Sequence, residues 1–598
     1  MKERPTLHTV TDALLALEAH DAHGFTFLEY PDGEISHTFA ELIARARATA
    51  GWLQSRGMNP GDRLALIIPD AHEFVVSFYG ALLAGVVPVP LFPPFALGEL
   101  QAYLEKTARL LQRAGARMVL TPKRIERILW PVTDTARSVE WIVALESVSR
   151  ARPDGFDPVA VRPEDPAFIQ FTSGSTQASR AVIVTHGNLV ANCRAIVGEG
   201  LVLDPGGDRG LSWLPLYHDM GLIGFVIAPL FVPVSVVFMP TTMFLRRPLL
   251  WFEMVHQKRA TVTFAPNFAY SLVTNRVTEA HLRKWDLSCL RVAGCGAEPI
   301  SAQTLETFLE RFSRAGLRAD ALVPSYGMAE ATLSISFKPA GTPWRTDVVD
   351  GRIFREHGRA IPVERTLEDT IEFVSCGRWL SGHSVRILDE EGNILDERCV
   401  GEIVVAGPSV TPGYLDDEAA TRATYRDGWL HTGDLGYLAD GELYVSGRKK
   451  DLIIVHGRNY TPEAIEWVIG EIPGIRRGNV AVFSRPGPRG TEEVVVACEV
   501  RSNDYDSLRK AIQARVSDTF GLSVADIVFL APRTLPKTTS GKIQRQRARQ
   551  LYMEGSLAAQ GPRGTGRSVP LSHLVALRMR AMVSRVRHST RRVFHSGE

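Results

Sequence analysis

Short apolar runs alternate with amphipathic segments through the first part of the chain, which is typical of parallel α/β units. Phe39, Leu42 and Ile43 recur at the spacing of one helical face. Further on, the pattern predicts strands at 63–68, 86–91, 118–120 and 141–145, with helices at 73–84, 98–114 and 123–130 between them. We therefore predict repeated strand–helix–strand units.

The pattern continues with shorter elements and then changes character. Apolar runs that can form strands lie at 211–216, 234–238, 261–264, 290–293 and 321–325. From about 340 to 372 the sequence is of mixed charge with little period, before strand-like pieces return at 384–388, 401–406 and 442–445. Residues 451 to about 553 show a compact α+β pattern. The predicted fold class is α/β, with a large multi-sheet N-terminal region and a small α+β C-terminal domain.

Length and composition agree with more than one domain and with an intracellular location. At 598 residues the chain exceeds what one core usually supports. Its six cysteines show no Cys-x-x-Cys spacing, so neither a zinc site nor a disulfide framework is predicted. The N-terminus lacks the apolar core of a signal peptide. Residues 221–245 carry no charge, but three prolines interrupt them, which favours buried elements over a membrane span. We expect a cytoplasmic protein.

The last 43 residues differ in charge from the rest. Residues 556–598 hold eight arginines and one acidic residue, a net charge of +7, which leaves −5 for the body. A flexible linker at 561–566 precedes a helix candidate in which apolar residues from Leu571 to Val586 recur at near-helical spacing. An anionic membrane surface, an acidic carrier protein and no partner at all are the alternatives for this tail. We favour peripheral contact with the inner membrane surface, and expect no nucleic-acid partner.

A loop of small hydroxyl-bearing residues follows the apolar run 167–169. Its backbone N–H groups and hydroxyls can converge on the oxygens of a phosphate, because aligned donors replace water around a charged group. Arg180, just past the loop, can add a positive charge. The loop residues are Thr172, Ser173, Gly174, Ser175 and Thr176.

Three further clusters complete a nucleotide site, although each alone could be an ordinary turn. Glycines at the end of the strand before Glu298 permit a flat ring to approach the backbone. Tyr326 can stack on a base, and Glu330 can hold Mg²⁺, which takes one or two carboxylates beside phosphate oxygens. Asp434, on a turn flanked by glycines, can accept two ribose hydroxyls. The nucleotide-binding residues predicted from these clusters are Gly296, Ala297, Glu298, Ser325, Tyr326, Gly327, Met328, Ala329 and Asp434.

Two more segments, 447–459 and 536–543, complete a set whose order and spacing resemble the adenylate-forming superfamily of acyl-CoA synthetases, adenylation domains and luciferases. The resemblance covers roughly residues 10–553 and implies that ATP and Mg²⁺ are used. It implies that Lys542 contacts the carboxylate and the α-phosphate, that Glu330 holds the metal, that Asp434 and Arg448 hold the ribose, and that Lys450 is a hinge. His218 lies by the substrate carboxylate or is a core histidine.

Within the superfamily the chain most resembles the fatty acyl-AMP ligases. The segments 213–224, 326–333, 374–377 and 457–459 carry this likeness, and the stretch 340–372 falls where that family has an insertion. Two departures stand out. Residues 177–181 differ from the usual Gly-x-Pro-Lys-Gly, and Ile453-Ile454 stands where many thioester-forming relatives have Ile-Lys.

The resemblance implies ATP-dependent conversion of a medium- or long-chain fatty acid to acyl-AMP, then transfer to the phosphopantetheine thiol of an acyl carrier protein. The alternatives are a fatty acyl-CoA synthetase and a catalytically silent adenylate-binding regulator. The expected domains are an adenylation domain at 1–449 with an insertion near 340–372, a mobile lid at 450–555, and a basic tail at 556–598.

Overall fold

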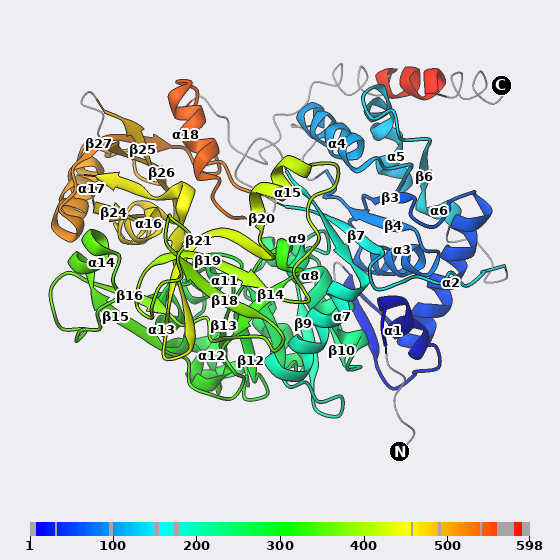
Figure 1. Ribbon diagram of the computed structural model, residues 1–598, viewed down its shortest axis with the longest axis horizontal. Coiled ribbons are helices and arrows are strands. Elements are labelled where there is room, and N and C mark those ends of the chain that lie inside the picture. Colours follow the sequence, from blue (N-terminus) through cyan, green and yellow to red (C-terminus); the bar gives the residue numbers. More distant parts are fainter. Residues whose placement is uncertain are drawn as a thin grey trace.

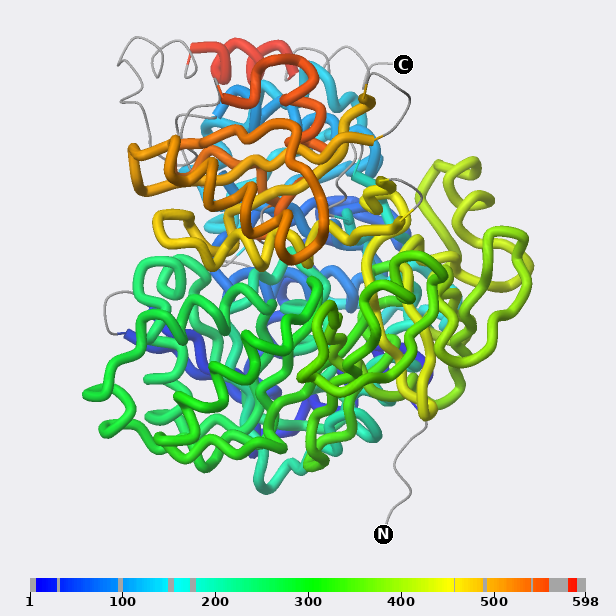
Figure 2. The backbone as a smooth tube through the Cα atoms, turned by 90° about the vertical axis from the view of Figure 1, so that its left-hand side faces the viewer, coloured from blue at the N-terminus to red at the C-terminus, as the bar shows by residue number. Residues whose placement is uncertain are grey.

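The computed structural model describes residues 7–29, 33–94, 100–148, 155–172, 179–455, 458–487, 492–538, 541–558 and 579–588. These residues form a large body of sheets and helices, with a smaller α+β unit on one side (Figure 1). The view from the side shows that this small unit covers one end of the body (Figure 2). The predicted fold class is therefore confirmed.

The first parallel sheet is buried on both faces. Its order is β4 (Val87–Pro90), β3 (Arg63–Leu66), β5 (Met118–Thr121), β6 (Trp141–Ala144). Successive side chains of a strand point to opposite faces. Leu64 and Leu66 accordingly join the main core with helix α3 (Ala71–Leu83), whereas Ala65 packs with α4 (Leu100–Ala114) and α5 (Lys123–Leu129). The predicted strand–helix–strand repeat is confirmed here, with element ends shifted by a few residues.

A nine-stranded sheet forms the centre of the body. Its strands β9 to β13 run parallel, so their carboxyl ends meet at one edge. Gly294 is required in this sheet, because a Cβ there would lie 2.0 Å from the ring of Phe264 on the neighbouring strand. The order is β17 (Arg378–Trp379), β14 (Ser334–Phe337), β13 (Leu322–Gly327), β12 (Val292–Cys295), β11 (Val262–Ala265), β9 (Arg209–Ser212), β10 (Ser235–Phe238), β1 (Gly24–Glu29), β2 (Gly33–Thr38).

Most of the uncharged stretch 221–245 is buried, as expected, and Leu245 at its end is exposed. It contains the end of α8 (Asp219–Leu222), irregular helical turns over Ile223–Ile227 and Ala228–Leu230, strand β10 and helix α9 (Thr241–Arg246). Among the helices that the structure describes, none has both the length and the apolar character needed to cross a bilayer.

A smaller antiparallel sheet follows. Its strands are β18 (Ser384–Leu388), β19 (Gly401–Ala406), β21 (Trp429–Ala439), β20 (Tyr425–Arg426) and β22 (Glu442–Arg448). The stretch 340–372, in which the sequence predicted no regular element, is folded against it. It forms β15 (Thr346–Asp350), α14 (Gly351–His357) and the start of β16 (Thr370–Val374). Phe354 and Phe373 pack on Tyr437 and Tyr444, which fixes the stretch to the body.

The small unit begins after β22. Strands β25 (Ile475–Pro486), β26 (Glu492–Val500) and β27 (Val524–Leu530) form its main sheet, and β23 (Ile453–Val455) pairs with β24 (Arg458–Tyr460). Helices α16 (Pro462–Gly470) and α17 (Tyr505–Phe520) share one core with this sheet, and α18 (Arg545–Met553) packs on the other side. We call this unit the lid.

Residues 579–588 of the basic tail are helical, and the other residues of the predicted tail helix lie outside the described residues. Although it follows the lid in sequence, the helix lies beside α4 and α5 of the body in both views (Figures 1 and 2). Ala581 is buried there in the same cluster as Trp130.

Candidate active site

A cavity of about 1850 Å³ lies between the body and the lid. The carboxyl ends of the parallel strands open into it, which is where open α/β sheets bind ligands. Most of the predicted residues that the structure describes line this cavity: Thr172, His218, Ala297, Glu298, Ser325, Tyr326, Gly327, Met328, Ala329, Glu330, Asp434, Arg448, Lys450 and Lys542. Gly296 is not among the lining residues, but its backbone adjoins Ser325, and a Cβ there would lie 2.6 Å from the Ser325 hydroxyl.

The two ends of the predicted phosphate loop are joined. The loop connects β7 (Pro166–Phe171) to β8 (Ala181–Thr185), which pair antiparallel. The Thr172 N–H donates to the Arg180 carbonyl at 2.9 Å, and the Arg180 N–H donates to the Thr172 hydroxyl at 3.3 Å. Ser173, Gly174, Ser175 and Thr176 lie outside the described residues.

Glu330 is linked to Arg180 through a tyrosine. The Tyr414 hydroxyl donates to Glu330 Oε1 at 2.9 Å and accepts from Arg180 Nη1 at 3.0 Å. The Arg180 guanidinium also lies over the Tyr414 ring, 4.8 Å from its centroid. Burial raises the pKa of Glu330, whereas the hydrogen bond from Tyr414 opposes the shift. A carboxylate and a cation are thus held side by side in the cavity wall, next to Thr172.

Asp434 accepts hydrogen bonds from two side chains. Its Oδ1 accepts from Arg448 Nε at 2.8 Å, and its Oδ2 accepts from the Tyr326 hydroxyl at 2.8 Å. Asp434 was predicted on a turn, and this is corrected: it lies within strand β21, at an irregular register beside Gly433, whose φ is +69°. The glycine accommodates a bulge rather than a turn. The Tyr326 hydroxyl thus contacts the Asp434 carboxylate, and Tyr326 also lines the cavity.

Lys542 reaches the cavity from the lid. Burial lowers the pKa of Lys542, while the carboxylates of Asp219 and Glu298 oppose the shift. Glu298 is fixed by the Phe268 N–H, which donates to its Oε1 at 2.6 Å. Burial, with a further contribution from Lys542, lowers the pKa of His218 to about 3, so His218 is neutral near pH 7. One cation thus faces two acidic side chains and a neutral imidazole.

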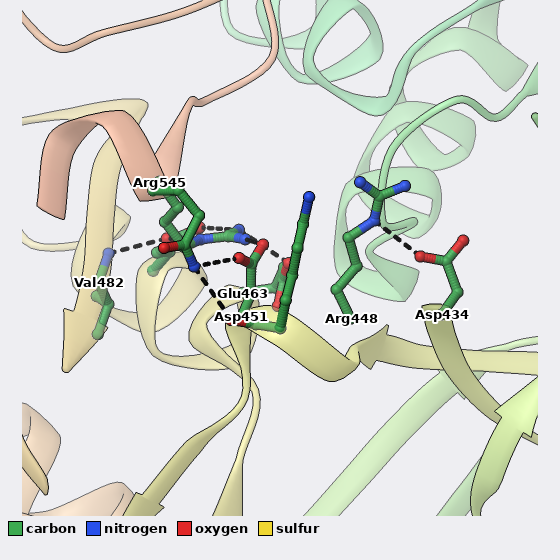
Figure 3. A network of polar contacts seen from close by, with 9 residues as sticks. Asp434, Arg448, Asp451, Glu463, Val482 and Arg545 are labelled. Atoms are coloured by element: carbon green, nitrogen blue, oxygen red, sulfur yellow. Dashed lines mark hydrogen bonds and ion pairs between the residues drawn. The ribbon is translucent and has the colours of Figure 1, made fainter. Parts of the chain in front are cut away.

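The predicted hinge, Lys450, lies in a short 3₁₀ turn at Lys449–Asp451 that joins body to lid. On the body side stands the Asp434–Arg448 pair (Figure 3). On the lid side, Arg545 forms ion pairs with three carboxylates: Asp451 at 2.9 Å, Glu463 at 2.8 Å and Glu466 at 2.7 Å (Figure 3). The turn therefore connects two separately anchored polar networks.

The apolar part of the cavity runs along the sheet. Val262 at the start of β11 and Pro266 beyond its end both line it, and strands rise about 3.3 Å per residue, so this wall is ~13 Å long. The other apolar residues lining this region include Ile196, Leu201, Trp213, Phe225, Val236, Phe264 and Phe337. Such a lining suits a hydrocarbon chain.

Two residues of the site had no assigned role in the sequence. Asp219 stood within a segment noted only for its family likeness, and Tyr414 carried no motif at all. Tyr414 is 84 residues from Glu330 in the chain, so no local spacing connects them. A tyrosine near a glycine-rich turn is a common feature, and only the fold identifies its partner.

Comparison with known proteins agrees with this geometry. The family model described as AMP-binding enzyme matches residues 16–415, and one described as the AMP domain of Disco-interacting protein 2-like proteins matches residues 450–561. The chain is 37% identical over 87% of its length to a Caulobacter vibrioides protein provisionally named an acyl-CoA synthetase, covering 90% of that protein. It is 31% identical to the medium-chain-fatty-acid–[acyl-carrier-protein] ligase JamA of Moorena producens, covering 93% of this chain and 96% of JamA.

Among solved structures, a fatty acyl-adenylate ligase from work on the E. coli and L. pneumophila enzymes superimposes with a TM-score of 0.86 at 36% identity, covering 92% of this chain and 98% of the other. The fold and the site define an adenylate-forming enzyme. The chain belongs to the AMP-binding enzyme family, within its branch of fatty acyl-AMP ligases.

Proposed function

We propose that the protein uses ATP and Mg²⁺ to convert a medium- or long-chain fatty acid to acyl-AMP and passes the acyl group to the phosphopantetheine thiol of an acyl carrier protein. One observation carries the adenylation step. Lys542 of the lid enters the same cavity as Glu330, the Asp434–Arg448 pair and the long apolar wall.

In this reaction a carboxylate oxygen of the fatty acid attacks the α-phosphorus of ATP, the bond to the bridging oxygen breaks, and pyrophosphate leaves with its electron pair. Negative oxygens crowd together in the transition state, so positioning and charge neutralisation supply the rate acceleration. Lys542 neutralises the carboxylate and the α-phosphate. Asp434, held by Arg448 and Tyr326, accepts the ribose hydroxyls.

Glu330 is the residue that would hold Mg²⁺. It lines the cavity, Tyr414 occupies its Oε1, and Oε2 accepts no hydrogen bond from the described residues. One carboxylate oxygen facing the phosphate region fits Mg²⁺, which takes most of its other ligands from phosphates and water. The bound ion would supply charge stabilisation to the departing pyrophosphate. Arg180 lies beside it and contacts the same phosphates.

The apolar wall supports the proposed acyl length, and the insertion supports the proposed acceptor. The wall has the depth for a chain of medium or greater length. The insertion is fixed to the body, and its Glu356 forms an ion pair of 2.6 Å with Arg458 of the lid. Adenylate-forming enzymes rotate the lid between adenylation and thioester formation. A bridge of this kind restrains that rotation, which supports transfer to a carrier protein rather than to free coenzyme A. JamA, by its name, uses such a carrier.

The decisive test is fatty-acid-dependent exchange of pyrophosphate into ATP, followed by intact-mass detection of a loaded carrier protein. Glu330→Ala should weaken ATP binding and slow exchange together, because the ion bridges substrate and protein. Exchange without magnesium would contradict that role. Acyl-CoA formed as readily as loaded carrier protein would instead favour an acyl-CoA synthetase, and nucleotide binding without exchange would favour a silent regulator.

We further propose that the protein acts in the cytoplasm and contacts the inner membrane surface through residues 556–598. The tail's net charge of +7 supports contact with an acidic surface.

A further inference from the structure

The helix at 579–588 has two faces of opposite character. Successive residues of an α-helix are about 100° apart, so Met579, Met582, Val583 and Val586 fall within one stripe ~100° wide. Ala581, Ser584, Arg585 and His588 fall on the opposite side. The apolar stripe is exposed: the exposed fraction is 66% for Met579, 70% for Met582, 47% for Val583 and 59% for Val586.

The opposite face is seated on the body. Ala581 and Ser584 are each 2% exposed, and the Ser584 hydroxyl donates to Asp134 Oδ2 at 3.0 Å. His588 Nε2 bonds the Glu140 carbonyl at 2.8 Å, and its ring packs on Trp130. Arg585 lies over the same Trp130 ring, 5.4 Å from its centroid, and 3.9 Å from Glu126. These contacts orient the helix so that its apolar stripe points away from the body.

This orientation is the reverse of that in a helix that contributes to a core, where the apolar stripe packs inward. Here small and polar residues make the intramolecular contacts, and the large apolar side chains face outward. Four such residues adjoining one another on the surface mark an interaction site more strongly than single exposed residues do. The helix therefore presents a surface that is fixed in place and apolar along its outer edge.

The charged residues of the helix itself have one sign. The helix carries three arginines and no acidic residue. On the wheel, Arg580 and Arg587 stand at about 80–100° from Met579, along one border of the apolar stripe. Helix α5, beside it, adds Lys123, Arg124 and Arg127, all of which are exposed. The acidic side chains beneath the helix, Glu126 and Asp134, are engaged by Arg585 and Ser584.

We propose that the outer face of the helix 579–588 is a membrane-docking surface that binds an anionic lipid bilayer while its inner face stays seated on the body. An apolar stripe bordered by arginines is the arrangement that inserts at the headgroup boundary of a bilayer. Arg580 and Arg587, along the border of the stripe, gain from the negative surface potential of the membrane. A soluble acidic protein would form ion pairs with the arginines but would leave the methionines and valines of the apolar stripe exposed to water. The proposal deepens the proposed membrane contact of residues 556–598 by naming the face that makes it. It rests on that part of the proposed function alone, so vesicle binding can fail while the proposed adenylation activity stands.

The test is co-sedimentation of the full-length protein with vesicles, with no activity measurement. The wild-type protein should partition onto vesicles of phosphatidylcholine and phosphatidylglycerol (3:1) and not onto phosphatidylcholine alone. Binding should fall at high salt, because exposed charges are screened beyond ~8 Å at physiological ionic strength. Met582→Ser with Val586→Ser should reduce partitioning about tenfold or more, since it removes half of the apolar stripe.

The matched control is Ile394→Ser, which removes an equally exposed apolar residue (60%) far from the helix in sequence and should leave partitioning unchanged. All three positions are exposed, so the variants should melt at the wild-type temperature. Arg580→Ser with Arg587→Ser should weaken binding to anionic vesicles severalfold. Equal partitioning by wild type and Met582→Ser/Val586→Ser would overturn the proposal. So would unchanged vesicle binding by Arg580→Ser/Arg587→Ser together with weaker binding of acyl carrier protein in a direct titration, which would assign the face to that partner.

Discussion

The Tyr414 hydroxyl donates a hydrogen bond of 2.9 Å to Oε1 of Glu330, and these two residues come from segments 84 positions apart. The same hydroxyl accepts from Arg180, so one phenol contacts both the carboxylate proposed to hold magnesium and the cation beside the predicted phosphate loop. This loop lacks the usual lysine. Arg180 therefore brings its charge to the cavity on a longer side chain that Tyr414 keeps in place.

We expect Tyr414→Phe to raise the half-saturating concentration of Mg·ATP about tenfold. A hydrogen bond to a charged group contributes ~1.5–3 kcal/mol, and the phenylalanine ring keeps the packing. Because the Tyr414 bond opposes the raised pKa of Glu330, its loss should also move the acidic limb of activity to higher pH. Pyrophosphate exchange measured against magnesium and pH checks both effects. An unchanged magnesium dependence would remove Tyr414 from the site.

Lys542→Ala should abolish acyl-AMP formation and leave ATP binding nearly intact, because the charge is needed mainly in the transition state. The lowered pKa of Lys542 adds a prediction about pH. The cationic form is the active one, so the rate should fall as pH rises, with a midpoint below the ordinary lysine value of about 10.4. Lys542→Arg keeps its charge, and its residual rate should not fall over the same range. Normal pyrophosphate release by Lys542→Ala would contradict the assignment.

His218 supplies the control for that pH profile. Its pKa of about 3 means that the imidazole stays neutral over the pH range of the assay. Titration of His218 therefore causes neither the decline in rate at low pH nor the decline at high pH. His218→Gln should change the rate without moving the midpoints of the profile.

The sequence predicted the parallel framework because buried strands and amphipathic helices leave local periodic signals. Leu64, Ala65 and Leu66 show why: a strand buried on both faces must be apolar at every position. The geometry of the site was harder to predict from the sequence. The glycine beside Asp434 indicated a turn, yet it accommodates a bulge within a strand, and only the neighbouring strand reveals the difference.

The insertion was recognised by its place and not by its elements. Its strands have five residues and its helix seven, so no periodic signal has room to develop. Its fold depends on Phe354 and Phe373 meeting Tyr437 and Tyr444 of the body, contacts between segments far apart in the sequence. Excising roughly 341–372 would expose both tyrosines, so a point variant tests its role more cleanly.

Glu356→Arg should loosen the lid and allow measurable acyl-CoA formation while acyl-AMP formation stays near the wild-type rate. Removing one partly exposed ion pair costs only ~0–1 kcal/mol, so charge reversal, which places a second positive charge opposite Arg458, gives the larger effect. Glu356→Arg combined with Arg458→Glu restores the pair and should suppress acyl-CoA again. Acyl-CoA formation that is equal in all variants would show that this bridge does not select the acceptor.

Arg545 offers the last prediction, on the stability of the lid. It faces three carboxylates at 2.7–2.9 Å, and Arg545→Met would leave them buried together, which costs about 3–5 kcal/mol. Arg547→Met, on the exposed side of the same helix, is the matched control and should be neutral. Hydrogen exchange in the lid peptides from residues 458–487 measures this loss of stability, because exchange reports the free energy of local opening.

The effect should depend on pH with a defined sign. Burial raises the pKa of Glu463 above its unfolded value, so folding favours the neutral acid. The stabilisation is fully present below the unfolded pKa and is lost as pH rises through the folded one. Without Arg545, which opposes this shift, the folded pKa rises further. After correction for intrinsic rates, the lid amides of Arg545→Met should therefore exchange more slowly at pH 5 than at pH 8. The difference between the two pH values should be larger in Arg545→Met than in the wild-type protein. A lid equally protected in both proteins at pH 8 would show that the three carboxylates do not need their cation.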